Sequence, residues 1–325
     1  MDNSNVSSFL SANEVPWKIL RSHETVRCIR SGMLPLLHAQ VVPTNKCNGG
    51  CRWCSCSRED RTVEVSDDKL HQLSKRLADE GCRAITITGG GEPTLHPGLV
   101  PWLRVSKALG IKLGMVTNGI IWGAEKGSAE GSECLTWLRL SITDTESGRY
   151  DLDRMSRICQ RLRGVDIGIS FTVSQHVSVQ TAVAVTLEAH HRPNCTHVRF
   201  VEDILNPCSD RMDAVRDACQ DISSKAIFQY RSQYVPGSRE CYWSLVKPVF
   251  AADGYVYPCC GVQYAQPGDM ALAFPKEWRM GTWDDFFGAT KPLPFNGLKC
   301  ARCYYAAQNN AISMLRADMV HEEFI

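Results

Sequence analysis

The sequence predicts an α/β fold built on a parallel sheet, and two observations lead to this prediction. Between residue 36 and about residue 230, short apolar runs of strand length alternate with patterns of helical period. Motifs containing Gly, Cys or Asn follow the first three of these runs. Strand–helix alternation calls for βαβ units with right-handed crossovers, which place the strands parallel in one sheet. Such motifs then meet at the carboxyl edge of the sheet, where α/β folds bind ligands.

The expected elements follow one another at short intervals. The first strand covers residues 36–42, and the next helix begins at the N-cap Ser66 and ends at Gly81. The apolar face of this helix has helical spacing and consists of Leu70, Leu73 and Leu77. The remaining elements are a strand at 84–88, a helix at 98–109, and strands at 112–117, 138–142, 166–173 and 197–201, with helices between the last four.

The pattern changes after residue 230, where Pro, Gly, aromatic residues and Cys become frequent. We expect a β-hairpin with strands at 247–251 and 255–257 and a turn at Asp253 and Gly254, then a last helix over 304–319. Because so short a segment buries little apolar surface, we expect a metal site to staple it. The chain thus divides into a helical N-terminal extension, an α/β domain and a small subdomain, at residues 1–35, 36–232 and 233–325.

Composition narrows the class of protein. The chain has 325 residues, 44% of them hydrophobic and 22% charged, as in globular domains, and its net charge of +1 gives no reason to expect a polyanionic partner. The first residues lack the pattern of a secretory signal, and no apolar run approaches the ~20 residues of a membrane span. We therefore expect a cytoplasmic protein that uses no membrane. In a reducing compartment, clusters among its sixteen cysteines indicate metal ligation rather than disulfides.

The first cysteine cluster, C-N-G-G-C-R-W-C, covers residues 47–54. Thiolates of Cys47, Cys51 and Cys54 on a Gly-containing loop can hold one face of a [4Fe–4S] cluster. The fourth iron is then open to a small molecule, to which it can transfer an electron. The alternative is a zinc loop, for which Cys56 is the nearest fourth ligand, although it is awkwardly close.

Two motifs together resemble the radical SAM superfamily, whose members use S-adenosylmethionine (SAM). The pattern C-x3-C-x-aromatic-C after the first strand, with Trp53 at the aromatic position, resembles the signature of the family. The GGGEPT segment after the second strand resembles its GGE motif, which in the family binds the amino group of SAM. The resemblance assigns that role to Gly90, Gly91 and Glu92. The alternative for GGGEPT is a tight turn before a helix.

The resemblance covers about residues 36–230 and implies a partial (β/α)6 barrel. Asn118 ends the third strand in a T-N-G motif that matches a family position. Ser141 and Ser170 lie where many members place a polar side chain near the carboxylate or ribose of SAM, although each could equally cap a strand. The family mechanism implies reductive cleavage of SAM to a 5′-deoxyadenosyl radical, which abstracts a hydrogen atom from the substrate. It also implies a reductant such as flavodoxin or ferredoxin.

A second cysteine cluster lies near the C-terminus. Four thiolates saturate a [4Fe–4S] cluster, and the candidate ligands are Cys241, Cys259, Cys300 and Cys303. Their spacing resembles the twitch subdomain, a shortened SPASM domain, which implies one auxiliary cluster. Cys260 is an adjacent alternative to Cys259, and a structural zinc site is the alternative to iron.

The substrate is the least determined part. Relatives with a twitch subdomain favour dehydrogenation or rearrangement of a small polar metabolite, of aminocyclitol or sugar type. Arg199 on the sixth strand is a possible contact, with a salt bridge across the barrel mouth as the alternative. Modification of a nucleoside, a nucleic-acid base or a peptide is a second possibility, but the net charge of +1 does not support a nucleic-acid substrate. A non-catalytic iron–sulfur or zinc-binding regulator is a third.

Overall fold

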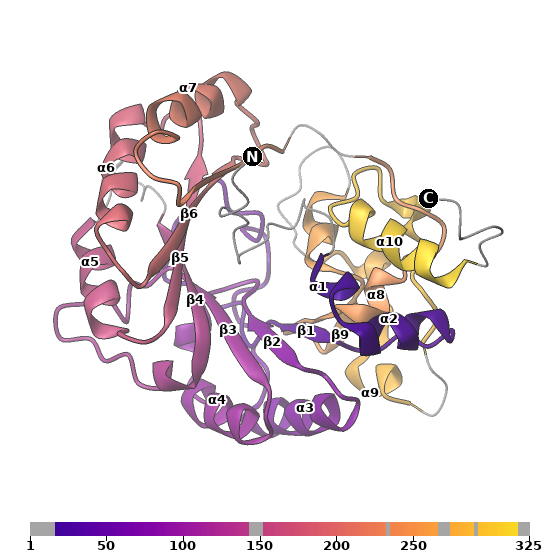
Figure 1. Cartoon of the computed structure of the whole chain (residues 1–325). Coiled ribbons are helices and arrows are strands. Elements are labelled where there is room, and N and C mark those ends of the chain that lie inside the picture. The colour runs from indigo at the N-terminus through magenta and orange to yellow at the C-terminus, as the bar shows by residue number, and fades with distance from the viewer. Residues whose placement is uncertain (1–16, 143–151, 232–234, 266–273, 289–291, 318–325) are drawn as a thin grey trace.

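The computed structural model describes residues 17–142, 152–231, 235–265, 274–288 and 292–317. Seven parallel strands lie side by side in chain order in a ten-stranded sheet (Figure 1). They are β1 (His38–Val41), β2 (Ala84–Ile87), β3 (Lys112–Thr117), β4 (Leu135–Ile142), β5 (Asp166–Val173), β6 (Cys195–Glu202) and β7 (Ala226–Gln229). The predicted α/β fold with a parallel sheet is confirmed.

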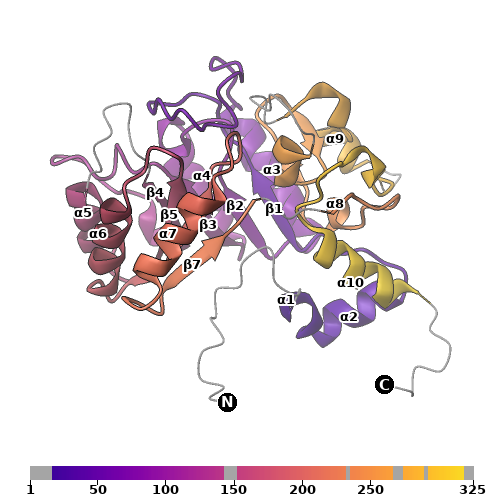
Figure 2. The same ribbon diagram turned by 90° about the horizontal axis from the view of Figure 1, so that it is seen from above.

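Five helices connect these strands and cover the outer face of the curved sheet (Figures 1 and 2). They are α3 (Asp67–Asp79), α4 (Leu99–Ala108), α5 (Leu152–Arg161), α6 (Val179–His190) and α7 (Ser209–Cys219). As predicted, Ser66 caps α3 by accepting a hydrogen bond from the Lys69 amide at 3.4 Å. Gly81 follows the end of α3 with a φ of 79°, a left-handed conformation that favours glycine.

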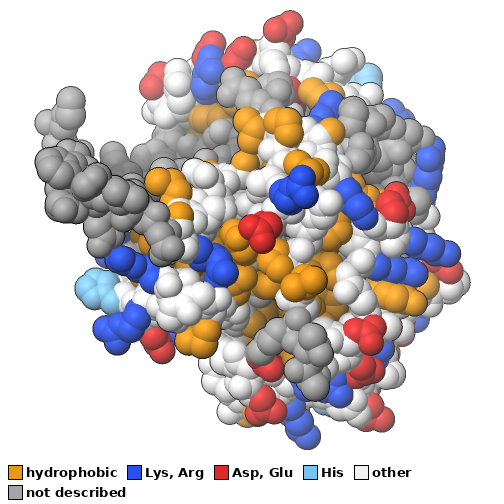
Figure 3. Space-filling model, turned by 90° about the vertical axis from the view of Figure 1, so that its right-hand side faces the viewer, with side chains coloured by type: hydrophobic (Ala, Val, Ile, Leu, Met, Phe, Trp, Pro, Cys, Tyr) orange, Lys and Arg blue, Asp and Glu red, His pale blue; other side chains and the backbone are white. Residues whose placement is uncertain are grey.

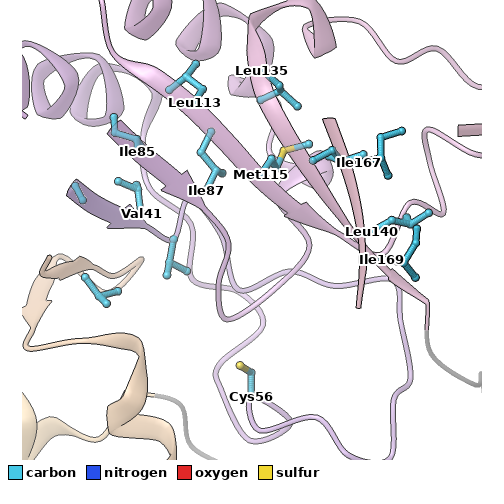
Figure 4. Close-up of a cluster of buried hydrophobic side chains, with 14 of the residues drawn as sticks. Val41, Cys56, Ile85, Ile87, Leu113, Met115, Leu135, Leu140, Ile167 and Ile169 are labelled. Atoms are coloured by element: carbon cyan, nitrogen blue, oxygen red, sulfur yellow. The ribbon is translucent and has the colours of Figure 1, made fainter. Parts of the chain in front are cut away.

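The main core lies between the sheet and these helices (Figure 4). Alternate strand residues point toward the helices because side chains on a strand alternate between its two faces. In β4, Leu138, Leu140 and Ile142 are fully buried, whereas Trp137, Arg139 and Ser141 between them are partly exposed. The sheet therefore has an apolar outer face and a more polar inner face. Buried side chains labelled in Figure 4 include Val41, Ile85, Ile87, Leu113, Met115, Leu135, Leu140, Ile167 and Ile169.

The C-terminal part extends the same sheet. β8 (Val249–Phe250) pairs parallel with β1, and β9 (Tyr255–Tyr257) pairs antiparallel with β8. The expected hairpin is thus present, and Gly254 in its turn has a φ of 84°. A short strand, β10 (Gly281–Thr282), adds to β9. The other elements here are α8 (Trp243–Val246), α9 (Trp283–Phe286), α10 (Ala306–Arg316) and 3-10 turns at Cys260–Tyr264, Lys276–Trp278 and Gly297–Lys299.

The N-terminal helices pack on the C-terminal part, a placement that the sequence did not reveal. α1 (Trp17–Leu20) and α2 (His23–Arg30) lie beside α10 (Figure 2). A second apolar cluster joins them and consists of Ile19, Ile29, Trp243, Val246, Tyr305 and Ile312. The last two residues of the predicted helix 304–319 and the first sixteen of the chain lie outside the described residues. The proposed domain boundaries near residues 35 and 232 stay predictions.

β7 is the one strand of the parallel series that the sequence analysis did not predict. It has four residues, Ala226–Gln229, of which Ala226, Ile227 and Phe228 are apolar, and Lys225 precedes them. So short an apolar run did not predict a strand. Its pairing with β6 nevertheless extends the sheet by one strand.

The surface carries charges of both signs. Figure 3 views the side of the molecule that carries the C-terminal elements and shows Lys, Arg, Asp and Glu side chains interspersed around apolar patches. No helix in the described part of the chain is both long and apolar enough to cross a membrane.

Candidate functional site

The loops after β1, β2 and β3 meet at the carboxyl edge of the sheet. The Glu92 amide, in the loop after β2, donates to the Lys46 carbonyl at 2.7 Å. Nδ2 of Asn118, after β3, donates to Oδ1 of Asn48 in the cysteine loop at 2.8 Å. The three motifs on which the sequence analysis relied are therefore side by side, as their positions after successive parallel strands predicted.

Glycine is required in the loop after β2 because two backbones approach closely there. A Cβ at Gly91 would collide with the Lys46 carbonyl, and one at Gly90 would collide with Oδ1 of Asn45. A Cβ at Gly89, whose φ is 151°, would collide with Val42. The G-G-G run is thus more than a turn before a helix, since it lets the cysteine loop lie directly on the end of β2.

Glu92 has a bracing role that the sequence analysis did not anticipate. Its side chain is buried, and Oε1 accepts hydrogen bonds from the hydroxyls of Thr94 at 2.7 Å and Thr117 at 2.6 Å. Oε2 accepts from the Asn118 amide at 2.7 Å. The carboxylate therefore fastens the ends of β2 and β3 together. Its predicted contact with the amino group of SAM stays a prediction, as do those of Gly90 and Gly91.

The three cysteines of the first cluster lie on a loop without regular structure. Cys47 is exposed, and Cys51 and Cys54 are partly exposed. A Cβ at Gly49 would lie 3.7 Å from Sγ of Cys47 and 3.8 Å from Sγ of Cys51, so both thiols flank this glycine. In the described residues, no three His, Cys, Asp or Glu side chains are grouped so as to hold a single metal ion.

The thiol of Cys54 differs from its neighbours in acidity. Hydrogen bonds from the Cys56 thiol and amide, together with the Arg61 guanidinium, outweigh burial and lower the pKa of Cys54 to about 6. Cys56 is buried, and its Sγ lies 3.6 Å from the Gly89 carbonyl, with which it can form a weak hydrogen bond. The thiolate is the form of cysteine that binds metals, so this environment favours ligation.

Arg61 is a functional candidate that the sequence analysis missed. Its Nη1 donates to the Asn45 carbonyl at 3.0 Å and to the Gly90 carbonyl at 2.7 Å, and it also interacts with Cys54. One guanidinium thus joins the cysteine loop to the G-G-E loop. No spacing pattern marks Arg61 in the sequence, because its partners are backbone groups 16 and 29 residues away.

Polar atoms at the edge of this region remain without partners within the described residues. They are Nε1 of Trp53 and Oδ1 of Asn45, both buried. Buried polar atoms are usually hydrogen-bonded, so each is suited to contact a bound ligand. Together with three thiols on one loop, these atoms fit an iron–sulfur cluster that binds a polar cofactor.

The predicted residues on β4, β5 and β6 lie in one row. Ser141 pairs in register with Ser170, which pairs with Arg199. Nη2 of Arg199 donates to Oγ of Ser170 at 3.2 Å. All three side chains are partly exposed on the inner face, near the carboxyl edge where Asn118 ends β3. The structure therefore brings Ser141, Ser170 and Arg199 together, while their roles stay predictions.

The four cysteines of the second cluster come from three segments that are held together. The Cys241 amide donates to the Phe295 carbonyl at 2.9 Å, and the Cys303 amide donates to the Val235 carbonyl at 2.7 Å. Gly237 and Gly297 allow these segments to cross, since a Cβ at either would collide with backbone of the other segment.

The structure distinguishes Cys259 from its neighbour Cys260. The thiol of Cys259 interacts electrostatically with those of Cys241 and Cys300. The thiol of Cys260 instead lies 3.0 Å from the Tyr305 hydroxyl. Cys259 is therefore the better placed of the two to complete the group of four.

Burial controls the acidity of this second group. Burial, together with the neighbouring thiols of the group, raises the pKa values of Cys241 and Cys300 to about 12. Burial also raises the pKa of Cys303. Without a bound metal these thiols therefore hold their protons, and loading with a metal would release them.

Comparisons with known proteins agree with this geometry. Residues 41–167 match the family model described as the radical SAM superfamily. A probable GTP 3′,8-cyclase from Sulfurisphaera tokodaii is 34% identical over 84 residues, which cover 25% of this chain and 26% of that protein. A GTP 3′,8-cyclase from Chlorobaculum tepidum is 34% identical over 89 residues, which cover 26% of each. The matched stretches thus span about a quarter of these curated relatives.

Solved structures show the same fold. Streptococcus suis SuiB bound to precursor peptide SuiA has a TM-score of 0.56 and 13% identity, covering 92% of this chain and 83% of that chain. The enzyme anSMEcpe with bound AdoMet and the Kp18Cys peptide has a TM-score of 0.53 and 16% identity, covering 88% and 85%. The family match covers residues 41–167 only, and the solved structures agree with it in fold.

Proposed function

We propose that this chain reductively cleaves SAM and uses the product to abstract a hydrogen atom from a substrate. The observation that supports this most strongly is the meeting of the C-x3-C-x2-C, G-G-E and T-N-G loops at one edge of the sheet. A protein that only holds a metal has no need of a second and third loop built against its cysteines. A domain that must orient a cofactor beside an open iron does need them.

Each residue of the site then has a definite task. Cys47, Cys51 and Cys54 hold a [4Fe–4S] cluster, which when bound can reduce SAM to methionine and a 5′-deoxyadenosyl radical. Backbone groups of Gly90 and Gly91, together with the Glu92 carboxylate, receive the amino group of SAM. Trp53 and Asn118 border the cofactor, and Ser141 and Ser170 orient its carboxylate or ribose, as the resemblance implies. Glu92 keeps the loops in place through its buried hydrogen bonds.

The second cluster of cysteines completes the proposal. Cys241, Cys259, Cys300 and Cys303 hold an auxiliary [4Fe–4S] cluster in a twitch-like subdomain, where four thiolates leave no iron open. Such a cluster can accept an electron from a substrate radical or can brace the subdomain. The proximity of these thiols, assembled from three segments, supports the proposal. A flavodoxin or ferredoxin would supply electrons to the first cluster.

The proposed substrate is a small polar metabolite, which undergoes dehydrogenation or rearrangement. Polar side chains on the inner face support this choice, among them Ser141, Ser170, His197 and Arg199. The aminocyclitol or sugar type is our first candidate. A nucleotide is the second, because the partial relatives are GTP 3′,8-cyclases.

The test is anaerobic reconstitution of the chain followed by an assay for 5′-deoxyadenosine with dithionite and SAM. We expect formation of 5′-deoxyadenosine by the wild type and less than about one hundredth of it in Cys51→Ala, which removes a cluster ligand. Cys82→Ala is the matched control, because Cys82 is a buried cysteine of the helix–sheet core outside both clusters. A wild-type protein that binds only zinc and makes no 5′-deoxyadenosine would instead support a non-catalytic regulator.

A further inference from the structure

Two basic residues, Arg139 and His197, lie on the inner face of the sheet, one row below Ser141, Ser170 and Arg199. Arg139 of β4 pairs in register with Gly168 of β5, which pairs with His197 of β6. Arg139 and His197 are partly exposed, whereas their strand neighbours Leu138 and Val198 are fully buried against the helices. Their side chains thus face the interior that the curved sheet surrounds.

Two glycines in the middle of strands make room for large side chains on this face. A Cβ at Gly114 of β3 would collide with the indole of Trp137, and a Cβ at Gly168 would collide with the imidazole of His197. Glycine weakens a strand, and its presence there is typical of sites where another group must approach closely. The Arg139 guanidinium carbon lies 5.5 Å from the centre of the Trp137 ring. The glycines therefore make room for the Trp137 indole and the His197 imidazole, and Arg139 lies near the indole.

The C-terminal part adds a lysine and a tyrosine to the same interior. Lys247, between α8 and β8, interacts electrostatically with Arg139, and its Nζ lies 5.6 Å from the centre of the Tyr305 ring. The hydroxyl of Tyr304 accepts a hydrogen bond from Nε2 of Gln229 in β7 at 2.8 Å. Tyr304 also interacts electrostatically with Lys247. A single set of groups thus bridges the sheet and the C-terminal part.

The basic groups in this interior affect one another's pKa values. Burial, and then the charges of Arg139 and Arg199, lower the pKa of His197 to about 4, so this imidazole is neutral at pH 7. Burial lowers the pKa of Lys247, thiols and Tyr304 raise it, and Arg139 lowers it. A partly desolvated place strengthens the attraction between a cation and an anionic group, because its dielectric constant is lower than that of water.

We propose that Arg139 and Lys247, the latter interacting with Tyr304, bind an anionic oxygen group of the substrate, a phosphate or a carboxylate. This inference rests on the proposed function, since it places the substrate on the inner face below the cofactor. The guanidinium fork of Arg139 suits both groups, because it can donate two parallel hydrogen bonds to either. The Trp137 ring then offers an apolar surface for the rest of the substrate.

Ligand binding by the reconstituted protein tests the proposal, with sodium pyrophosphate and sodium succinate as probes. Sodium chloride at equal ionic strength is the reference for both calorimetric titration and thermal unfolding. We expect at least one probe to bind the wild type and to raise its Tm by about 3 °C. Preference for pyrophosphate would identify a phosphate site, and preference for succinate a carboxylate site.

Variants connect the binding to the named residues. Arg139→Gln should weaken binding of the preferred probe about tenfold or more, and Arg139→Lys by less, since it keeps the charge but loses the fork. Lys247→Gln serves as a second variant if Arg139→Gln unfolds. Arg104→Gln is the matched control and should bind as the wild type does, because Arg104 pairs with Glu130 on an exposed surface.

Two results would overturn the proposal. One is a wild type that binds neither probe more tightly than chloride, and the other is an Arg139→Gln variant that binds as tightly as the wild type. The assay for 5′-deoxyadenosine in the same preparations separates this outcome from failure of the proposed function. Anion binding through Arg139 without SAM cleavage would support the anion site and contradict the proposed function. SAM cleavage without anion binding would support the proposed function and contradict the anion site.

Discussion

The two cysteine groups of this chain have opposite environments. Cys47, Cys51 and Cys54 lie on an exposed or partly exposed loop at the carboxyl edge of the sheet. The pKa of Cys54 is lowered there to about 6 by hydrogen bonds from Cys56 and by Arg61. Cys241, Cys259, Cys300 and Cys303 come from three segments that glycines bring together, and burial raises the pKa values of all four. The first group is open to solvent and to other loops, and the second is enclosed.

This difference agrees with a division of labour. An iron that must bind SAM needs an approach for a ligand and nearby groups that orient it, as the G-G-E and T-N-G loops do. A cluster that exchanges only electrons, or that braces a subdomain, gains from burial and from four ligands. The sequence indicates the same division, because the first group has three cysteines and the second has four. The environments of the two groups add a physical reason for this division.

Alkylation of the metal-free protein should give the largest contrast between the two groups. At pH 7 we expect iodoacetamide to modify Cys54 about 100-fold or more faster than Cys241, because the thiolate reacts and the thiol does not. The rate at Cys54 should fall as the pH drops below about 6, since protonation removes its thiolate. Peptide mass mapping over time measures both rates. Equal rates at the two positions would contradict the contrast.

Removal of the brace between the loops should weaken the fold around the first group. In Glu92→Gln, an amide replaces an oxygen that accepts hydrogen bonds from Thr117 or Asn118. We expect a loss of about 2 kcal/mol in the free energy of unfolding, or roughly 30-fold in the unfolding constant. Urea denaturation measures it. The control Glu130→Gln, at an exposed ion pair with Arg104, should be unchanged, and equal stability of the two variants would refute the brace.

Iron content tests the membership of the second group. The reconstituted wild type should hold about eight iron ions, four in each cluster. Cys259→Ala should reduce this to about four, since it removes a ligand of the auxiliary cluster only. A full complement of iron in this variant, measured together with sulfide, would exclude Cys259 as a ligand.

Cys260→Ala should produce the smallest change. Its thiol lies 3.0 Å from the Tyr305 hydroxyl and so has a hydrogen-bond partner outside the group of four. We expect the same iron content as in the wild type. If Cys260→Ala lost half the iron and Cys259→Ala lost none, Cys260 rather than Cys259 would be the ligand.

The sequence predicted what depends on short-range pattern. Helical spacing predicts the apolar face of Leu70, Leu73 and Leu77, which is buried in α3, and the order of motifs along the chain predicts three loops at one edge. Glu92 braces β2 to β3, and Arg61 joins the cysteine loop to the G-G-E loop. Both contacts depend on partners distant in sequence, so no local pattern predicts them. The roles of Gly114 and Gly168 could not be predicted either, because a glycine within a strand does not indicate which side chain lies over it.

One measurement tests the division between the two groups most directly. It compares dithionite-driven formation of 5′-deoxyadenosine from SAM by Cys47→Ala and by Cys300→Ala, each reconstituted under the same conditions. We expect none with Cys47→Ala, which loses a ligand of the cluster with the open iron, and continued formation with Cys300→Ala. Formation of 5′-deoxyadenosine by Cys47→Ala, or its absence in Cys300→Ala alone, would contradict the assignment of SAM cleavage to the first group.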